Sequence, residues 1–157
     1  LAAQLKISRD EAKEQMEAYF ARFGGVRDYL HHVVDEARRN EYTATLFGRR
    51  RYLPDLNSDN WQRRQSAERM ALNAPIQGTA ADIIKVAMIN VHKHMTAQNL
   101  RSRMLLQVHD ELVLEIAAGE RDTVEKLVRA EMGAAISLSV PLEVSVGYGQ
   151  SWDAAAH

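Results

Sequence analysis

Two adjacent acidic residues and a histidine lie between two apolar runs in the second half of this chain. His109, Asp110 and Glu111 follow Met-Leu-Leu at residues 104–106 and precede Leu-Val-Leu at residues 112–114. This pattern predicts a β-hairpin with the two acids at its tip. Adjacent carboxylates repel each other unless a cation, a donor or a proton lies between them. Asp110 and Glu111 are therefore candidate ligands for a hard divalent ion such as Mg²⁺.

Two other interpretations of this acidic pair stay open. It could be a plain acidic turn, which protein surfaces use freely, and His109 could be only a turn residue. It could also be the His-Asp pair of a metal phosphohydrolase. That pair normally lies on a helix, whereas the residues flanking Asp110 are strand-like.

A polar stripe is the second candidate feature. Arg69, Asn73 and Gln77 are spaced i, i+4 and i+8, so they share one helix face if the helix continues through Pro75. The surrounding residues are mostly apolar, and all three side chains are donors of the kind that read groove edges of nucleic acid. The alternative is a solvated stripe on a half-buried helix.

One interpretation of the charge distribution is a basic block for a polyanion beside an acidic centre for a cation, although the formal net charge is only −1. Basic residues outnumber acidic ones between residues 38 and 69, and acidic residues outnumber basic ones between 110 and 131. The three consecutive arginines at residues 49–51 could contact phosphates. The alternatives are solvated helix faces for the charged blocks and a soluble hairpin tip for the arginines.

The totals limit the class of protein. A chain of 157 residues fits one domain or a large part of one, with 46% hydrophobic and 26% charged residues. It has no cysteine, which excludes disulfides and thiolate metal sites. We expect a soluble, cytoplasmic protein, because no apolar run is long enough to span a bilayer and no signal peptide is visible. The chain opens without Met, as if within an amphipathic helix, so we expect a fragment.

The elements before the polar stripe are predicted to be two helices and a small hairpin. A capping box at residues 8–11 predicts a helix from about Arg9 to a break at Gly24. A second helix with a buried stripe from residue 26 to 37 should pack antiparallel on it. Strands at 42–46 and 51–53 form a basic hairpin. The loop at 55–60 is the best candidate for a subdomain boundary.

The elements after residue 60 surround the acidic hairpin. Helices are predicted at 61–73 and 77–98, with a break or kink at Ala74-Pro75. The second of these is apolar almost all round at its start, which predicts deep burial under a sheet. A helix at about 120–136 and an alternating strand at 142–146 follow. The predicted fold class is α+β, with helices packed on a small antiparallel sheet.

Three segments together resemble the bacterial family A DNA polymerases. They are Gln-Val-His-Asp-Glu at residues 107–111, Asn-Ala-Pro-Ile-Gln-Gly-Thr-Ala-Ala-Asp at 73–82 and Thr-Leu-Phe-Gly-Arg-Arg-Arg-Tyr-Leu-Pro at 45–54. The resemblance covers the whole chain, and the closing residues from Trp152 match the family's C-terminus. It implies part of a right-hand polymerase of DNA replication and repair. Residues 1–56 would belong to the fingers and 57–157 to the palm.

The resemblance implies template-directed transfer of deoxynucleotides to a primer 3′ end by two-metal catalysis with Mg²⁺. One ion would activate the 3′ hydroxyl and the other would stabilise the leaving pyrophosphate. Asp110 aligns with the metal-binding palm carboxylate, Glu111 with an accessory neighbour, and His109 with a residue near the primer terminus. The residues aligned with contacts to the primer–template duplex, largely on its minor-groove side, are Arg69, Asn73 and Gln77.

The resemblance also implies that essential parts lie upstream of this chain. These are the family's first metal-binding aspartate and the fingers residues that hold the incoming deoxynucleoside triphosphate. With one of two principal carboxylates missing, we expect the fragment alone to be inactive. The competing interpretation is a non-catalytic DNA-binding module that keeps the duplex-facing helix and does no chemistry.

Overall fold

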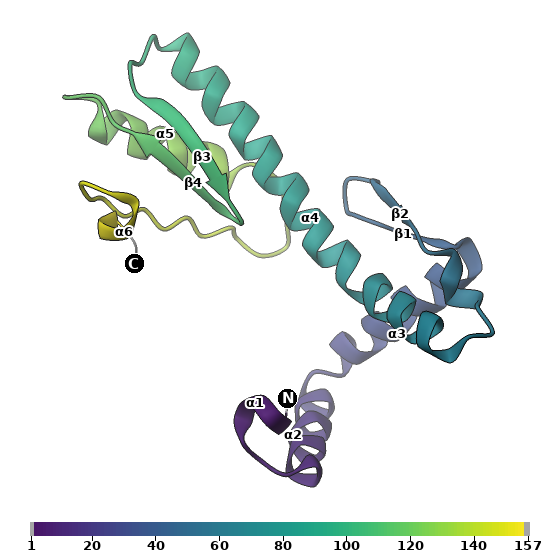
Figure 1. The fold of residues 1–157 in the computed structure, drawn as a ribbon. Helices are drawn as coiled ribbons and strands as arrows, with labels where there is room; N and C mark the ends of the chain where they lie inside the picture. The colour runs from purple at the N-terminus through teal and green to yellow at the C-terminus, as the bar shows by residue number, and fades with distance from the viewer. Residues whose placement is uncertain (1, 156–157) are drawn as a thin grey trace. The chain divides into compact units, whose positions relative to one another are not determined.

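The computed structural model of the chain describes residues 2–155 and contains helices and two small antiparallel sheets (Figure 1). The chain divides into two compact units, Leu1–Ile76 and Gln77–His157. The predicted α+β class is confirmed, because each unit combines helices with one two-stranded antiparallel sheet. Within residues 2–155 no helix is both long and apolar enough to cross a membrane.

The first unit begins with helices α1 (Ala2–Leu5), α2 (Arg9–Arg22) and α3 (Gly24–Asn40). The predicted capping box is confirmed. Ser8 Oγ accepts a hydrogen bond from the Glu11 backbone N–H at 3.1 Å, and the Ser8 N–H donates to Glu11 Oε2 at 2.8 Å. Helix α2 ends at Arg22, and Phe23 separates it from α3.

The predicted burial between α2 and α3 is found only in part. The large side chains expected there are 40–51% exposed: Met16, Tyr19, Phe23, Val26 and Tyr29. Only Ala12 of α2 and Ala37 of α3 are buried. Phe20, Leu30, Val33 and Val34 are half-buried, so the described residues cover these two faces only in part.

The core of the first unit forms around the hairpin and the start of α4. Strands β1 (Tyr42–Ala44) and β2 (Arg50–Tyr52) pair antiparallel, and a short 3₁₀ helix, η1 (Pro54–Asn57), follows. The buried residues that pack together are Ala37, Leu53, Leu56, Ala67 and Ala71. Arg38 of α3 and Glu68 of α4 form an ion pair at 2.6 Å beside this core.

Helix α4 (Trp61–Ala97) runs without a break through Pro75. The predicted break at Ala74-Pro75 is therefore wrong, and the two predicted helices are one. Proline in a helix interior costs about 3 kcal/mol, because it removes one backbone hydrogen bond and crowds the preceding turn. Here Ala71, Ala74 and Pro75 are all buried, so packing offsets that cost.

The second unit packs the later part of α4 against α5 (Arg121–Gly133) and a hairpin of β3 (Arg103–Val108) and β4 (Glu111–Glu115). Its core residues are Val91, Met95, Val124, Leu127 and Val128. The predicted burial of α4 on all sides is wrong, because Ala80 and Ile89 are exposed. The buried side is a narrow stripe of Ile84, Ala87, Val91 and Met95.

Two features of the second unit differ from the predicted strands. The β3–β4 ladder pairs Met104 with Leu114 and then Leu106 with Val113, so Leu105 is a β-bulge. The segment at 142–146 is not a strand, although its residues alternate. Alternation shows only that a segment could cover a sheet, and a strand also needs a neighbour to pair with. A short helix, α6 (Trp152–Ala155), follows this segment.

Candidate functional site

The tip of the β3–β4 hairpin carries the predicted acidic site. Val108 pairs with Glu111, which leaves His109 and Asp110 as a two-residue loop. His109 has φ of 53°, in the left-handed region that few residues other than glycine adopt. The Gln107 side-chain amide donates a hydrogen bond to the His109 carbonyl oxygen and so braces this turn. The hairpin was predicted correctly, and its tip exposes His109, Asp110 and Glu111 to solvent.

The Glu111 carboxylate contacts a residue from the far end of the chain. Its Oε2 accepts a hydrogen bond from the indole Nε1 of Trp152, the first residue of α6, at 3.2 Å. Trp152 is 48% exposed, so this contact lies at the surface. No spacing in the sequence could have revealed this contact, because 41 residues separate the two partners.

The base of the hairpin is closed by Glu120, which precedes α5. Its carboxylate accepts hydrogen bonds from the backbone N–H groups of Arg101 and Ser102 and from Ser102 Oγ, at 2.7–3.0 Å. The bond from the Arg101 backbone, followed by those from Ser102, lowers the pKa of Glu120 from 4.5 to about 2. Ser102 Oγ also accepts from the Ala117 N–H at 2.9 Å. This arrangement, the Glu120 latch, joins the start of β3 to the end of β4.

The segment between α5 and α6 is hydrogen-bonded to side chains of α5. Tyr148 donates a hydrogen bond to Glu125 at 2.9 Å, and Arg121 lies over the Tyr148 ring at 3.9 Å. Arg129 donates to Glu125 at 2.9 Å and also to the carbonyl oxygen of Val144. The Arg129 and Tyr148 hydrogen bonds lower the pKa of Glu125, and burial is the main cause that raises the pKa of Tyr148.

The acidic tip offers few ligands for a metal by itself. Among residues 2–155 there is no group of three or more His, Asp or Glu side chains placed to hold a metal ion. Mg²⁺ is often bound through only one or two carboxylates, with water and substrate phosphates completing its coordination. The exposed Asp110 carboxylate fits that role, whereas one oxygen of Glu111 is already engaged by Trp152.

The predicted polar stripe lies on α4. Arg69 and Asn73 are exposed at successive turns in the first unit, and Gln77 is exposed at the start of the second unit. Because α4 is continuous through Pro75, the i, i+4 spacing of these residues is preserved along one helix.

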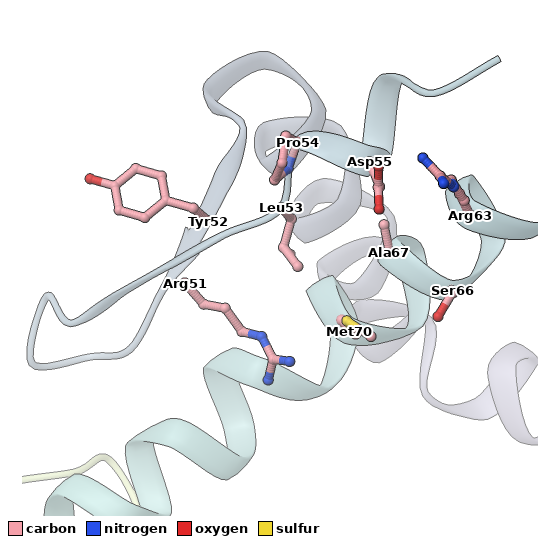
Figure 2. A pocket seen from close by; sticks show the side chains of 9 residues that line it. All are labelled: Arg51, Tyr52, Leu53, Pro54, Asp55, Arg63, Ser66, Ala67 and Met70. Atoms are coloured by element: carbon pink, nitrogen blue, oxygen red, sulfur yellow. The ribbon is translucent and has the colours of Figure 1, made fainter. Parts of the chain in front are cut away.

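The first unit contains a pocket that sequence reasoning did not identify. It is a cavity of about 310 Å³ lined by β2, η1 and the beginning of α4 (Figure 2). Arg51 reaches from β2 toward Met70 on α4, and Arg63 lies at another part of the wall. The lining also includes the Asp55 carboxylate, and the guanidinium groups of Arg51 and Arg63 are of the kind that contacts phosphate oxygens. Arg51 belongs to the arginine run that the sequence marked for such contacts.

Comparison with known proteins decides the family. The family model described as DNA polymerase family A matches residues 1–154. The chain belongs to the family A DNA polymerases. It is 70% identical over all 157 residues to DNA polymerase I of Mycobacterium bovis and 68% identical to that of Mycobacterium leprae. It is 50% identical over 152 residues to DNA polymerase I of Bacillus caldotenax. The chain spans 17% of the length of each of these polymerases.

A solved structure in this family has the same fold. It is the POL domain of Pol1 from M. smegmatis in complex with DNA primer-template and dNTP, with a TM-score of 0.97 and 68% sequence identity. The alignment covers 100% of this chain and 28% of that polymerase chain. The family and fold expected from the sequence are therefore confirmed.

Proposed function

We propose that this chain is the C-terminal polymerase part of a DNA polymerase I, with residues 1–56 in the fingers and 57–157 in the palm. In the complete enzyme it would serve template-directed transfer of deoxynucleotides to a primer 3′ end. The observation that carries the proposal is the hairpin tip. The two-residue loop exposes the Asp110 carboxylate, and the Glu120 latch closes the hairpin base behind it.

Asp110 is the proposed catalytic carboxylate and metal ligand. A divalent cation bound there, which we propose to be Mg²⁺, would supply Lewis-acid chemistry for phosphoryl transfer, as one of two metals in the active site. The protein's part is to hold the Asp110 carboxylate where the primer terminus and the triphosphate meet. The tight turn does this, because Gln107 braces the backbone next to Asp110 through the His109 carbonyl oxygen. Glu111, held by Trp152, has an accessory role.

The DNA-binding part of the proposal rests on exposed donors of α4. Arg69, Asn73 and Gln77 would contact the minor-groove side of the primer–template duplex, where acceptors common to all correct base pairs allow checking without reading the sequence. His109 would lie near the primer terminus. The wall of the pocket in Figure 2, with Arg51 and Arg63, is a further candidate contact for backbone phosphates.

The 157-residue chain alone is proposed to be inactive. The described residues hold no group of three acidic or histidine side chains for a metal, and the relatives are about six times longer. The second principal carboxylate and the grip on the triphosphate would come from the rest of the polymerase. Primer extension by the purified chain with Mg²⁺ and four dNTPs, above a blank, would contradict this.

The test of the function is Asp110→Ala in the complete polymerase. Loss of a carboxylate that stabilises developing charge should lower the single-turnover incorporation rate by about a thousandfold or more. Primer–template affinity should change little, because Asp110 is not part of the duplex-binding stripe. Gln77→Ala, as the matched contrast, should instead weaken duplex binding. An Asp110→Ala enzyme that keeps most of its incorporation rate would remove Asp110 from the chemistry.

A further inference from the structure

Helix α6 contacts the tip of the β3–β4 hairpin through Trp152. Trp152 Nε1 donates to Glu111 Oε2 at 3.2 Å, and Glu111 is the residue directly after Asp110. An indole N–H can only donate, so this bond is made only when a carboxylate or other acceptor faces it. The contact therefore holds one oxygen of the Glu111 carboxylate.

The segment that carries Trp152 is itself held in place from two directions. Upstream, Tyr148 is bonded to Glu125 at 2.9 Å and covered by Arg121 at 3.9 Å. Downstream, the Ser151 hydroxyl and carbonyl oxygens accept from the backbone N–H groups of Ala154 and Ala155, which closes the turn into α6. Trp152 is thus presented to the hairpin from a segment anchored on α5.

Gly149 shows how tightly this segment folds back. A Cβ added at Gly149 would lie 2.5 Å from the backbone carbon of Ala154 and 2.7 Å from its oxygen. Backbone atoms cannot move aside as a flexible side chain can, so residue 149 must be glycine for α6 to sit where it does. The position of Trp152, two residues before Ala154, depends on this close approach.

We propose that Trp152 is a positioning residue for the polymerase active site. The inference rests on the proposed function: Trp152 holds the Glu111 carboxylate in one orientation beside Asp110, and the tail on α5 holds Trp152. It acts through Glu111, not on the substrate. Without the indole N–H, Glu111 gains rotamer freedom, and its charge is no longer kept at a fixed place next to the metal-binding carboxylate.

The experiment uses the complete polymerase and single-turnover incorporation of one nucleotide. Trp152→Phe keeps an aromatic ring and removes the N–H. We expect the rate to fall about three- to tenfold, within the range that follows from the net value of one typical hydrogen bond, because this bond is solvent-exposed. Primer–template affinity should stay unchanged, and the Mg²⁺ concentration needed for half-maximal rate should rise. Trp61→Phe is the matched control, because Trp61 is also exposed, at 60%, and lies in the other unit.

A double-mutant cycle separates positioning from simple structural support. In a Glu111→Ala background the indole has no carboxylate to hold, so Trp152→Phe should have no further effect on the rate. Equal losses in both backgrounds would overturn the inference, and so would a Trp152→Phe rate within the error of wild type. Gly149→Ala provides a second variant that keeps Trp152 but displaces α6. It should reproduce the rate loss, and a wild-type rate would count against the inference.

The Asp110→Ala variant, measured alongside, distinguishes failure of the proposed function from failure of the role of Trp152. If Asp110→Ala keeps its rate, the proposed function fails. If Asp110→Ala is inactive and Trp152→Phe is unimpaired, only the role of Trp152 fails.

Discussion

The Glu120 latch should govern how firmly the β3–β4 hairpin is held, and Ser102→Ala tests this directly. Ser102 is 6% exposed, and its hydroxyl makes two hydrogen bonds: it donates to Glu120 Oε2 at 2.7 Å and accepts from the Ala117 N–H at 2.9 Å. Alanine removes a bond to a charged group, worth about 1.5–3 kcal/mol, and leaves the Ala117 N–H without that acceptor. We expect the hairpin to lose about 3 kcal/mol of local stability.

Native-state amide hydrogen exchange on the complete polymerase measures this loss, because it reports the free energy of local opening. Amides of the β3–β4 ladder should exchange about a hundredfold faster in Ser102→Ala, since each 1.4 kcal/mol is a factor of ten. Amides of the first unit should keep their wild-type rates. The incorporation rate should fall as well, because Asp110 lies at the tip of the same hairpin.

Thr96→Ala is the matched control for removal of a hydroxyl. Thr96 is exposed on α4, and its Oγ1 bonds only locally, to the His92 carbonyl oxygen at 2.9 Å. We expect a change within about 0.5 kcal/mol there. If Ser102→Ala and Thr96→Ala changed hairpin exchange equally little, the reasoning that assigns the latch a mechanical role would be refuted.

Three further predictions follow from the second unit. The pKa of Glu120 is lowered from 4.5 to about 2, so the latch should contribute its full stability above pH 4.5 and lose it as the pH falls toward 2. Amide exchange of the hairpin measured as a function of pH tests this. Glu120→Gln should make the exchange less dependent on pH. His109→Val should destabilise the hairpin by about 1 kcal/mol, because β-branched residues tolerate the left-handed region poorly. His109→Asn should keep the turn yet lower primer extension. Equal amide exchange of the hairpin in the two variants would argue against backbone strain at residue 109. Leu127→Ala, at a side chain 7% exposed, should cost about 2–5 kcal/mol in the exchange of α5 amides, and a cost below 1 kcal/mol would place Leu127 outside the core.

Local signals in the sequence were sufficient to predict secondary structure wherever one short segment determines its own conformation. The capping box at Ser8 and Glu11 predicted the start of α2 within one residue, and the acids at Asp110 and Glu111 between two apolar runs predicted the hairpin. Family resemblance then supplied the identity that composition could not. The individual roles of Asp110, Glu111 and the polar stripe remain predictions for the experiments above.

Features that depend on distant partners could not be predicted. The alternation at 142–146 gave no information on whether a neighbouring strand exists, and the apolar stripe of α2 gave none on whether it is covered. Pro75 is compatible with α4 because its surroundings are buried, which is a tertiary effect. Glu120 contacts Ser102, 18 residues away, and Trp152 contacts Glu111, 41 residues away. Neither Glu120 nor Trp152 lies in a recognisable motif.

The bulge at Leu105 changes the phase of the hairpin part-way along β3. Arg103 shares a face with Glu115, yet beyond the extra residue it is Leu106 and Val108 that occupy that same face, opposite Val113 and Glu111. In β3 this face is therefore occupied by an odd-numbered residue at the base, and by Leu106 and Val108, which are even-numbered, beyond the bulge. In the base of β3 the even-numbered Met104 therefore lies on the face of Leu114, whereas nearer the tip the odd-numbered Gln107 lies on the face of Leu112.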